Sequence, residues 1–204
     1  MSQEAKQREL EELRARMSQI EAELAREQTQ GQWPPKGYYT AYHVLAGFVL
    51  GMLGAVTSLL FNIVGSLLVG QHPLQLIRVY LTFPLGAEAL SIDGGVTLAI
   101  GCCLYLATGT LLGIPFHLLL TRWLPHAPFA ARLAGVSALA LVIWVVNFYA
   151  ILAWVQPLLF GGRWIVDLVP WWVAALTHLI FGWTMLFVQP LGEFVPYGTK
   201  QEDR

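Results

Sequence analysis

Four long apolar runs dominate this sequence and limit what the chain can fold into. They cover about residues 40–70, 95–121, 131–160 and 169–191, and each is long enough to cross a ~30 Å hydrocarbon core as a helix. Inside a bilayer, backbone polar groups must be hydrogen-bonded within the protein, and a single segment achieves this only as a helix. The sequence therefore predicts an all-α fold, a four-helix transmembrane bundle that contacts the lipid bilayer.

Charge is concentrated before the first run. Only 12% of the residues are charged, against ~25% in soluble domains, and 13 of these 25 side chains (12 Lys and Arg, 13 Asp and Glu) lie in residues 1–36. The net charge of −1 gives no reason to expect nucleic acid as a partner. We expect a coiled-coil arm at 1–30, a linker at 31–39, the bundle at 40–191 and a tail at 192–204.

The arm carries a heptad pattern. Apolar residues occupy alternating a and d positions at spacings of three and four: Leu10, Leu13, Met17, Ile20 and Leu24. In a parallel pair Glu9 would face Arg14, and Arg16 would face Glu21, so the flanking charges are complementary. The pattern favours a homo-oligomer, and the alternative is a single amphipathic helix that docks on a partner or on the membrane. Pro34 and Pro35 then end the helix.

Loop charges predict the orientation. If both termini are cytoplasmic, ten basic residues lie inside and only Arg78 and Arg163 lie outside. The inner set is Lys6, Arg8, Arg14, Arg16, Arg26, Lys36, Arg122, Arg132, Lys200 and Arg204. We expect a multi-pass inner-membrane protein with both termini in the cytoplasm. The outer loop between spans one and two, about 71–94, is mostly apolar and either packs over the bundle or contacts a partner.

Small residues mark faces on the first two spans. On span one Gly47, Gly51 and Gly54 share a narrow arc with Ser58 and Asn62, and on span two Gly109 and Gly113 form a second GxxxG pair. In lipid such stripes let two helices approach closely. We interpret these glycines as helix-packing surfaces.

A polar layer is predicted near the middle of the membrane. At 1.5 Å per residue, Asn147 lies about 24 Å and His178 about 20 Å from the cytoplasmic side, and Tyr105 and Thr108 fall in the same band. We expect Asn147 and His178 to pair directly or through one water. The layer is either interhelical glue or a proton, quinone or ligand site.

Histidines raise the alternative of a cofactor. His43 and His117 are expected at a shared depth near the inner surface, whereas His178 lies deeper, so only the first two suit the axial positions of a haem b. We expect no metal site and no catalytic site, because the sequence has no CxxC, CxxCH, HExxH or phosphate-loop pattern. The expected cofactor content is therefore none, with haem b as the minority alternative.

A weak resemblance points to a class of protein. Span four reads Trp171-Trp172-Val173-Ala174-Ala175-Leu176-Thr177-His178-Leu179-Ile180-Phe181-Gly182, and it follows a span that bears Trp144, Asn147 and Tyr149. This segment resembles small four-helix prokaryotic membrane proteins of unknown function. The long outer loop and the end of span two, Ile114-Pro115-Phe116-His117, are similar to hypothetical proteins encoded near respiratory oxidases.

Three functions follow as hypotheses. The first is a non-catalytic accessory or assembly subunit of an inner-membrane, possibly respiratory, complex, with larger membrane subunits or further copies of itself as partners. The second is a haem- or quinone-binding electron-transfer subunit that uses His43, His117 or His178. The third is a small transporter or channel, which the lack of deep charges in the spans disfavours.

The orientation gives a first testable prediction. A cysteine introduced at Leu90 should react with a membrane-impermeant thiol reagent added outside intact cells, and one introduced at His126 should react only after lysis. The native Cys102 and Cys103 are replaced beforehand. Protection of position 90 together with outside labelling of position 126 would reverse the predicted orientation.

Overall fold

The computed structural model describes residues 12–20 and 36–193, without the side chains of 36–39. These residues form helices and connecting loops, and none of them lies in a strand, so the all-α prediction is confirmed for this part of the chain. The chain divides into two compact units, Met1–Thr40 and Ala41–Arg204.

In the first unit, residues 12–20 are helical. The side chains of Leu13, Met17 and Ile20 are all at least half exposed on this helix. The other two residues of the expected seam, Leu10 and Leu24, lie outside the described residues.

Four helical stretches are long and apolar enough to cross a membrane: Thr40–Leu68, Val96–Trp123, Phe129–Phe160 and Trp171–Gly192. The first stretch belongs to α2 (Lys36–Leu68), and the second consists of α4 (Val96–Leu118) and the π-helical turn Leu119–Trp123. The third consists of α5 (Phe129–Val145), the π-helical segment Val146–Leu152 and α6 (Ala153–Phe160). The fourth consists of α8 (Trp171–Val188) and the 3-10 turn Gln189–Gly192. The predicted four-span architecture of a multi-pass membrane protein is thus confirmed. We number these stretches spans one to four.

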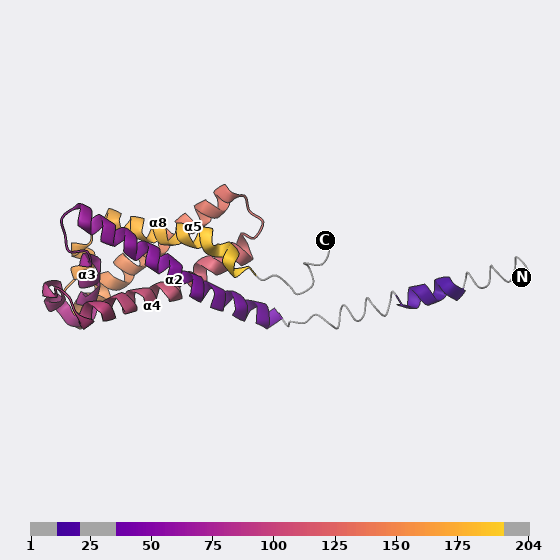
Figure 1. Cartoon of the computed structure of the whole chain (residues 1–204), viewed down its shortest axis with the longest axis horizontal. Coiled ribbons are helices and arrows are strands. Elements are labelled where there is room, and N and C mark those ends of the chain that lie inside the picture. Colours follow the sequence, from indigo (N-terminus) through magenta and orange to yellow (C-terminus); the bar gives the residue numbers. More distant parts are fainter. Residues whose placement is uncertain (1–11, 21–35, 194–204) are drawn as a thin grey trace, which may run out of the picture. The chain divides into compact units, whose positions relative to one another are not determined.

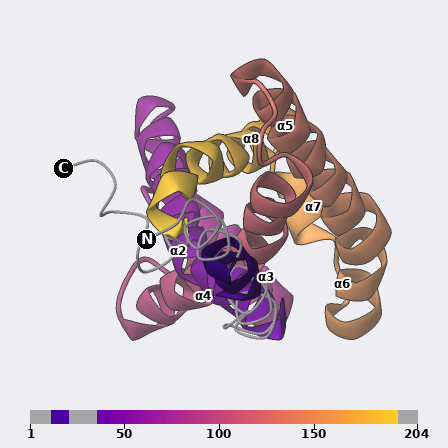
Figure 2. The same ribbon diagram turned by 90° about the vertical axis from the view of Figure 1, so that its right-hand side faces the viewer.

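Span four lies at the centre of the bundle. Figure 2 shows α8 between α2 and α5, with α4 beside α2 and α6 at the edge. Phe116, Phe181 and Met185 are buried together with Val136 and Ala140 of α5. The rings of Phe116 and Phe181 lie 5.4 Å apart, so these aromatic side chains join spans two and four.

The loop between spans one and two folds back onto the bundle. It contains α3 (Gln75–Leu85) and the 3-10 turn Gly86–Ser91. Figure 1 shows α3 at one end of the bundle. Ile77 and Leu81 are buried against Gly101 of α4, where a Cβ would lie 2.6 Å from Ile77 Cγ2. Arg78 binds Asp93 and donates from Nε to the Ile92 carbonyl at 2.6 Å, which closes the loop. The described loop therefore packs against α4.

A buried glutamine ties both loops at this end to span three. Gln156 of α6 is fully buried; its Nε2 donates to Thr82 Oγ1 of α3 at 3.0 Å. Its Oε1 accepts from the backbone N–H of Ile165, in α7 (Trp164–Leu168), at 3.1 Å. One side chain thus satisfies groups on α3 and α7.

The two GxxxG pairs face each other. A Cβ on Gly113 would lie 2.2 Å from the Gly47 carbonyl oxygen and 2.4 Å from Gly51 Cα, so backbone contacts backbone at this crossing. A Cβ on Gly109 would lie 2.3 Å from Ala55 Cβ, and one on Gly54 would lie 2.9 Å from the Phe181 ring. The five glycines therefore set how closely α2 approaches α4 and α8.

This crossing gives the second prediction. Gly113→Ala should lower the free energy of unfolding by roughly 1–3 kcal/mol, because the added methyl group overlaps backbone atoms that cannot rotate away. The matched control is Gly65→Ala on the same helix pair, where no atom lies within 4 Å of the new Cβ. It should be neutral or stabilise the helix by up to about 1 kcal/mol. Unfolding by a denaturing detergent, followed by circular dichroism, checks both, and equal stability of the two variants would contradict the packing argument.

Candidate functional site

Two groups of polar side chains join the helices of the bundle. We name the first, His43 and His117, the histidine pair. We name the second, Ser58, Asn62, Tyr80, Tyr105, Thr108 and Thr177, the polar ladder. Both join span one to neighbouring helices, so the glycine crossing fixes their geometry.

The histidine pair forms directly across the crossing of α2 and α4. Nδ1 of His43 lies 3.4 Å from Nε2 of His117, and the two ring centroids are 5.5 Å apart. His117 is fully buried and His43 partly so. The structure thus brings together the two histidines that the sequence placed at one depth.

The pair does not fit a haem held between its two rings. Bis-histidine ligation requires a flat macrocycle between the imidazoles and two metal–nitrogen bonds of about 2 Å each. At this level the helices are in contact, since a Cβ on Gly47 would lie 2.9 Å from His117 Cβ. No gap for a macrocycle separates the two rings, so the geometry disfavours the haem alternative.

A chain of hydrogen bonds lies at the end of span four. Arg132 Nη2 of α5 donates to Gln189 Oε1, and Gln189 Nε2 donates to Glu193 Oε1 at 2.9 Å. Gln189 is almost completely buried, so its amide carries the contact between Arg132 and Glu193. Within the described ranges, no three His, Cys, Asp or Glu side chains lie close enough together to hold a metal ion.

The polar ladder crosses the middle of the bundle. Asn62 Nδ2 of span one donates to Thr177 Oγ1 of span four at 2.9 Å and to the Ser58 carbonyl at 2.8 Å. Ser58 Oγ and Tyr105 Oη lie 2.9 Å apart, which links spans one and two. Tyr80 Oη and Thr108 Oγ1, 2.7 Å apart, extend the ladder to α3. The three side-chain to side-chain contacts each join two different helices, whereas the bond from Asn62 to the Ser58 carbonyl lies within α2.

The membership of this layer differs from the one predicted. Tyr105 and Thr108 belong to it, although Thr108 is exposed on the bundle surface rather than buried. Asn147 and His178 share no hydrogen bond, so their predicted direct pairing is wrong. His178 Nδ1 instead lies 2.8 Å from the Ala174 carbonyl oxygen of its own helix, and its ring packs edge-on to Phe148. No hydrogen bond to the Asn147 side chain occurs among the described residues.

The glycine stripe of span one carried a sequence signal for two ladder residues. Ser58 and Asn62 lie on the glycine stripe of span one, and a stripe residue faces a neighbouring helix. Thr177 is next to His178 in sequence, but its side chain contacts Asn62 of span one, whereas the His178 ring contacts Phe148 of span three. The sequence did not predict the contacts of Gln156, which is only an amide near the end of an apolar run.

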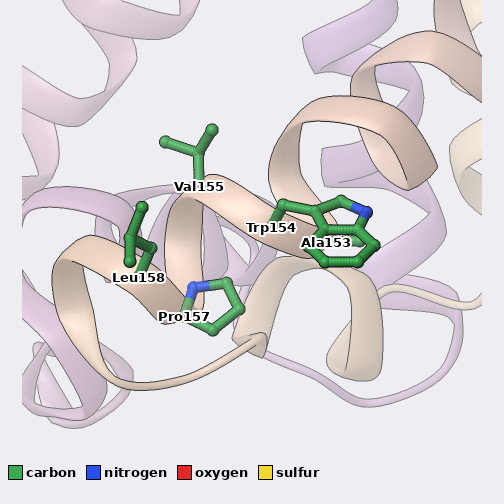
Figure 3. A pocket seen from close by; sticks show the side chains of 5 residues that line it. All are labelled: Ala153, Trp154, Val155, Pro157 and Leu158. Carbon is green, nitrogen blue, oxygen red and sulfur yellow. The ribbon is translucent and has the colours of Figure 1, made fainter.

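One surface depression lies on span three and has a mostly apolar lining. It has a volume of about 410 Å³ and is lined by one helix, α6, through Ala153, Trp154, Val155, Pro157 and Leu158 (Figure 3). Polar groups fix the orientation of a ligand in most binding sites, and none converges here. We interpret the depression as part of the apolar outer surface of span three.

The chain matches no known family model, no curated protein and no solved structure. Function therefore rests on the geometry of the described residues.

The polar ladder gives the third prediction. Asn62→Leu should lower the free energy of unfolding by roughly 1–2 kcal/mol, the range found for interhelical hydrogen bonds in model membrane helices. Thr177→Val should cost less when Asn62 is already replaced, because the two side chains share one hydrogen bond. Unfolding measurements on the two single variants and the double variant determine the coupling. The control, Asn147→Leu, should change stability by less than about 0.5 kcal/mol, as is usual away from buried hydrogen-bond networks; a larger loss there than at Asn62 would reverse the assignment.

Proposed function

We propose that this chain is a non-catalytic accessory subunit of a larger membrane complex and that it self-associates through its N-terminal helix. The observation that carries the proposal is the exposure of Leu13, Met17 and Ile20, by 59%, 62% and 50%, on one face of that helix. In water, apolar side chains repeated along one helix face are stabilised when a second helix covers them.

A second copy of the chain is the occupant that the charges favour. The flanking residues Glu9 and Arg16 pair with Arg14 and Glu21 of a parallel partner, and both pairs have opposite signs. An unrelated partner would need to supply the same alternation of charge. The proposal therefore commits to a parallel homo-oligomer.

The polar contacts inside the bundle support an accessory role. Asn62 pairs with Thr177, Ser58 with Tyr105 and Gln156 with Thr82, so these polar groups are used to join helices. Trp183 Nε1 likewise donates to Ser137 Oγ at 2.9 Å, which joins spans three and four. Side chains engaged in this way stabilise a scaffold, which is the role that interhelical hydrogen bonds commonly have in membranes.

The outer face of span three supports lateral packing against a partner. It is the least buried of the four spans, and Trp154 and Leu158 on α6 are exposed by 74% and 83%. A bilayer covers such a face, and an apolar span of another subunit covers it equally well. A prokaryotic inner membrane with both termini in the cytoplasm, and a respiratory complex as host, remain part of this proposal on the loop charges and the resemblance.

The fourth prediction tests the arm in the full-length protein. Ile20→Asp should weaken self-association by at least about tenfold, because it places a charge in the apolar seam. The matched control is Gln19→Asp, which adds the same charge at the neighbouring c position outside the seam. Energy transfer between two fluorescent labels on the chain in lipid nanodiscs or detergent micelles measures the association.

Two outcomes contradict the proposal. One is a wild-type protein that stays monomeric at the highest concentration tested, and the other is equal weakening by both substitutions. Either result favours a single amphipathic helix that docks on a different partner or on the membrane surface.

A further inference from the structure

One amide side chain within the spans makes no hydrogen bond. The spans contain four amides, and three of them, Asn62, Gln156 and Gln189, are bonded to other side chains of the bundle. The fourth, Asn147 of span three, has no hydrogen bond to any described residue. In hydrocarbon an amide without a partner is unfavourable, because lipid tails cannot replace the hydrogen bonds that water would make.

The amide of Asn147 is open to the surroundings of the bundle. The residue is partly exposed, and its polar side-chain atoms reach the surface of span three. It lies near the middle of that span, in the π-helical segment Val146–Leu152. Such segments are rare in proteins and are often found at functional sites. The group that satisfies this amide must therefore come from within the membrane and from outside the chain.

The surface around Asn147 is free for a second helix. Val146 and Ile151 are exposed by 44% and 43%, and Trp154, one turn further along, by 74%. Span three is the least buried of the four spans, and Figure 2 shows α5 and α6 along one edge of the bundle. A membrane helix that approaches from the lipid side would cover these apolar side chains and the amide together.

A second copy of the chain is the partner that the amide favours. All copies carry the same loop charges and insert in the same orientation, so Asn147 lies at the same depth in each of them. An amide both donates and accepts, and two facing amides on a two-fold axis each donate from Nδ2 to Oδ1 of the other. A different protein would satisfy Asn147 only if one of its spans carried a polar group at this depth, whereas a second copy always does.

We propose that span three forms a second self-association contact, in which Asn147 pairs with Asn147 of a second copy in the middle of the membrane. The proposal rests on the proposed homo-oligomer in taking a second copy as the partner, but the contact lies in the bundle and not in the arm. One polar pair in an apolar interface also fixes the register of two helices, because any shift leaves both amides without a partner.

The fifth prediction tests the amide in the full-length protein, reconstituted in liposomes. Asn147→Leu should weaken self-association by about tenfold, because it removes both hydrogen bonds of the reciprocal pair. Asn147→Gln keeps the amide and should weaken association less. Energy transfer between labelled copies, measured as lipid dilutes the protein, gives the association constants. Since Asn147 makes no bond within its own chain, its replacement should leave the unfolding of a single chain unchanged.

The matched control is Thr57→Val on span one. Thr57 is also an exposed polar residue in a span, but its Oγ1 donates to the Leu53 carbonyl of its own helix at 2.9 Å. Because that hydroxyl already has a partner, the substitution should leave association unchanged. Equal weakening by Thr57→Val and Asn147→Leu would mean that association follows the polarity of the surface, and it would reject the amide pair.

Cross-linking tests the contact in a chain that keeps Asn147. With Cys102 and Cys103 replaced, Ile151→Cys should form a covalent dimer when copper phenanthroline oxidises the liposomes. Val64→Cys, on span one and exposed by 55% in the wild type, should stay monomeric. Absence of the Ile151→Cys dimer, or equal dimer formation at both positions, would overturn the proposal even where an Asn147 variant fails to fold.

The two self-association contacts can fail separately. Weakening by Ile20→Asp but not by Asn147→Leu rejects the membrane contact and leaves the arm as the only interface. Weakening by Asn147→Leu but not by Ile20→Asp supports the membrane contact and rejects the arm. A wild-type chain that is monomeric at every lipid dilution rejects both.

Discussion

The backbone contact between α2 and α4 at Gly47, Gly51, Gly109 and Gly113 determines most of what lies inside this bundle. Because the two helices approach until Gly113 meets the backbone of Gly47 and Gly51, side chains above and below the crossing are brought within hydrogen-bond distance. The histidine pair lies on one side of the crossing, and the Ser58–Tyr105 contact lies on the other. A crossing held apart by larger residues would leave both pairs too far apart to interact.

The same contact decides which functions the histidine pair supports. Close helices exclude a macrocycle between the rings, but they leave the outer edge of the His117 ring beside the short turn Gln189–Gly192. A glycine again sets the geometry there, because any side chain at residue 192 would overlap the ring or Leu50. The packing that leaves no room for a haem between the two rings thus also brings the edge of the His117 ring against Gly192.

The number and approximate limits of the spans could be predicted because apolar length is a one-dimensional property of the sequence. The glycine stripes could be interpreted as packing surfaces because few other residues permit a close approach, but which stripes face each other came only from the structure. The pairing of polar residues did not follow from depth. Asn62 and Asn147 are both amides in spans, yet only Asn62 is hydrogen-bonded to a neighbouring helix. Asn147 lies in the π-helical segment Val146–Leu152, whose wider turns shift every later side chain from the face expected at 100° per residue. Gln156 follows that shift, and its contacts with α3 and α7 depend on how two loops fold back, which no periodicity encodes.

Exposure has opposite meanings in the two environments that this chain occupies. Along spans one to four an exposed leucine or valine is solvated by lipid, so the apolar surface of the bundle alone says little about partners. The buried nitrogen of His117 without a partner is informative there, because hydrocarbon offers it no substitute for water. In the charged N-terminal segment the reasoning is reversed. An unpaired polar atom would be hydrated at no cost, whereas the stripe formed by Leu13, Met17 and Ile20 is unfavourable in water until another surface covers it. Among the described residues, the features without a partner therefore include an apolar face outside the spans and three buried polar atoms within the bundle: His117 Nδ1, Arg132 Nε and Trp144 Nε1.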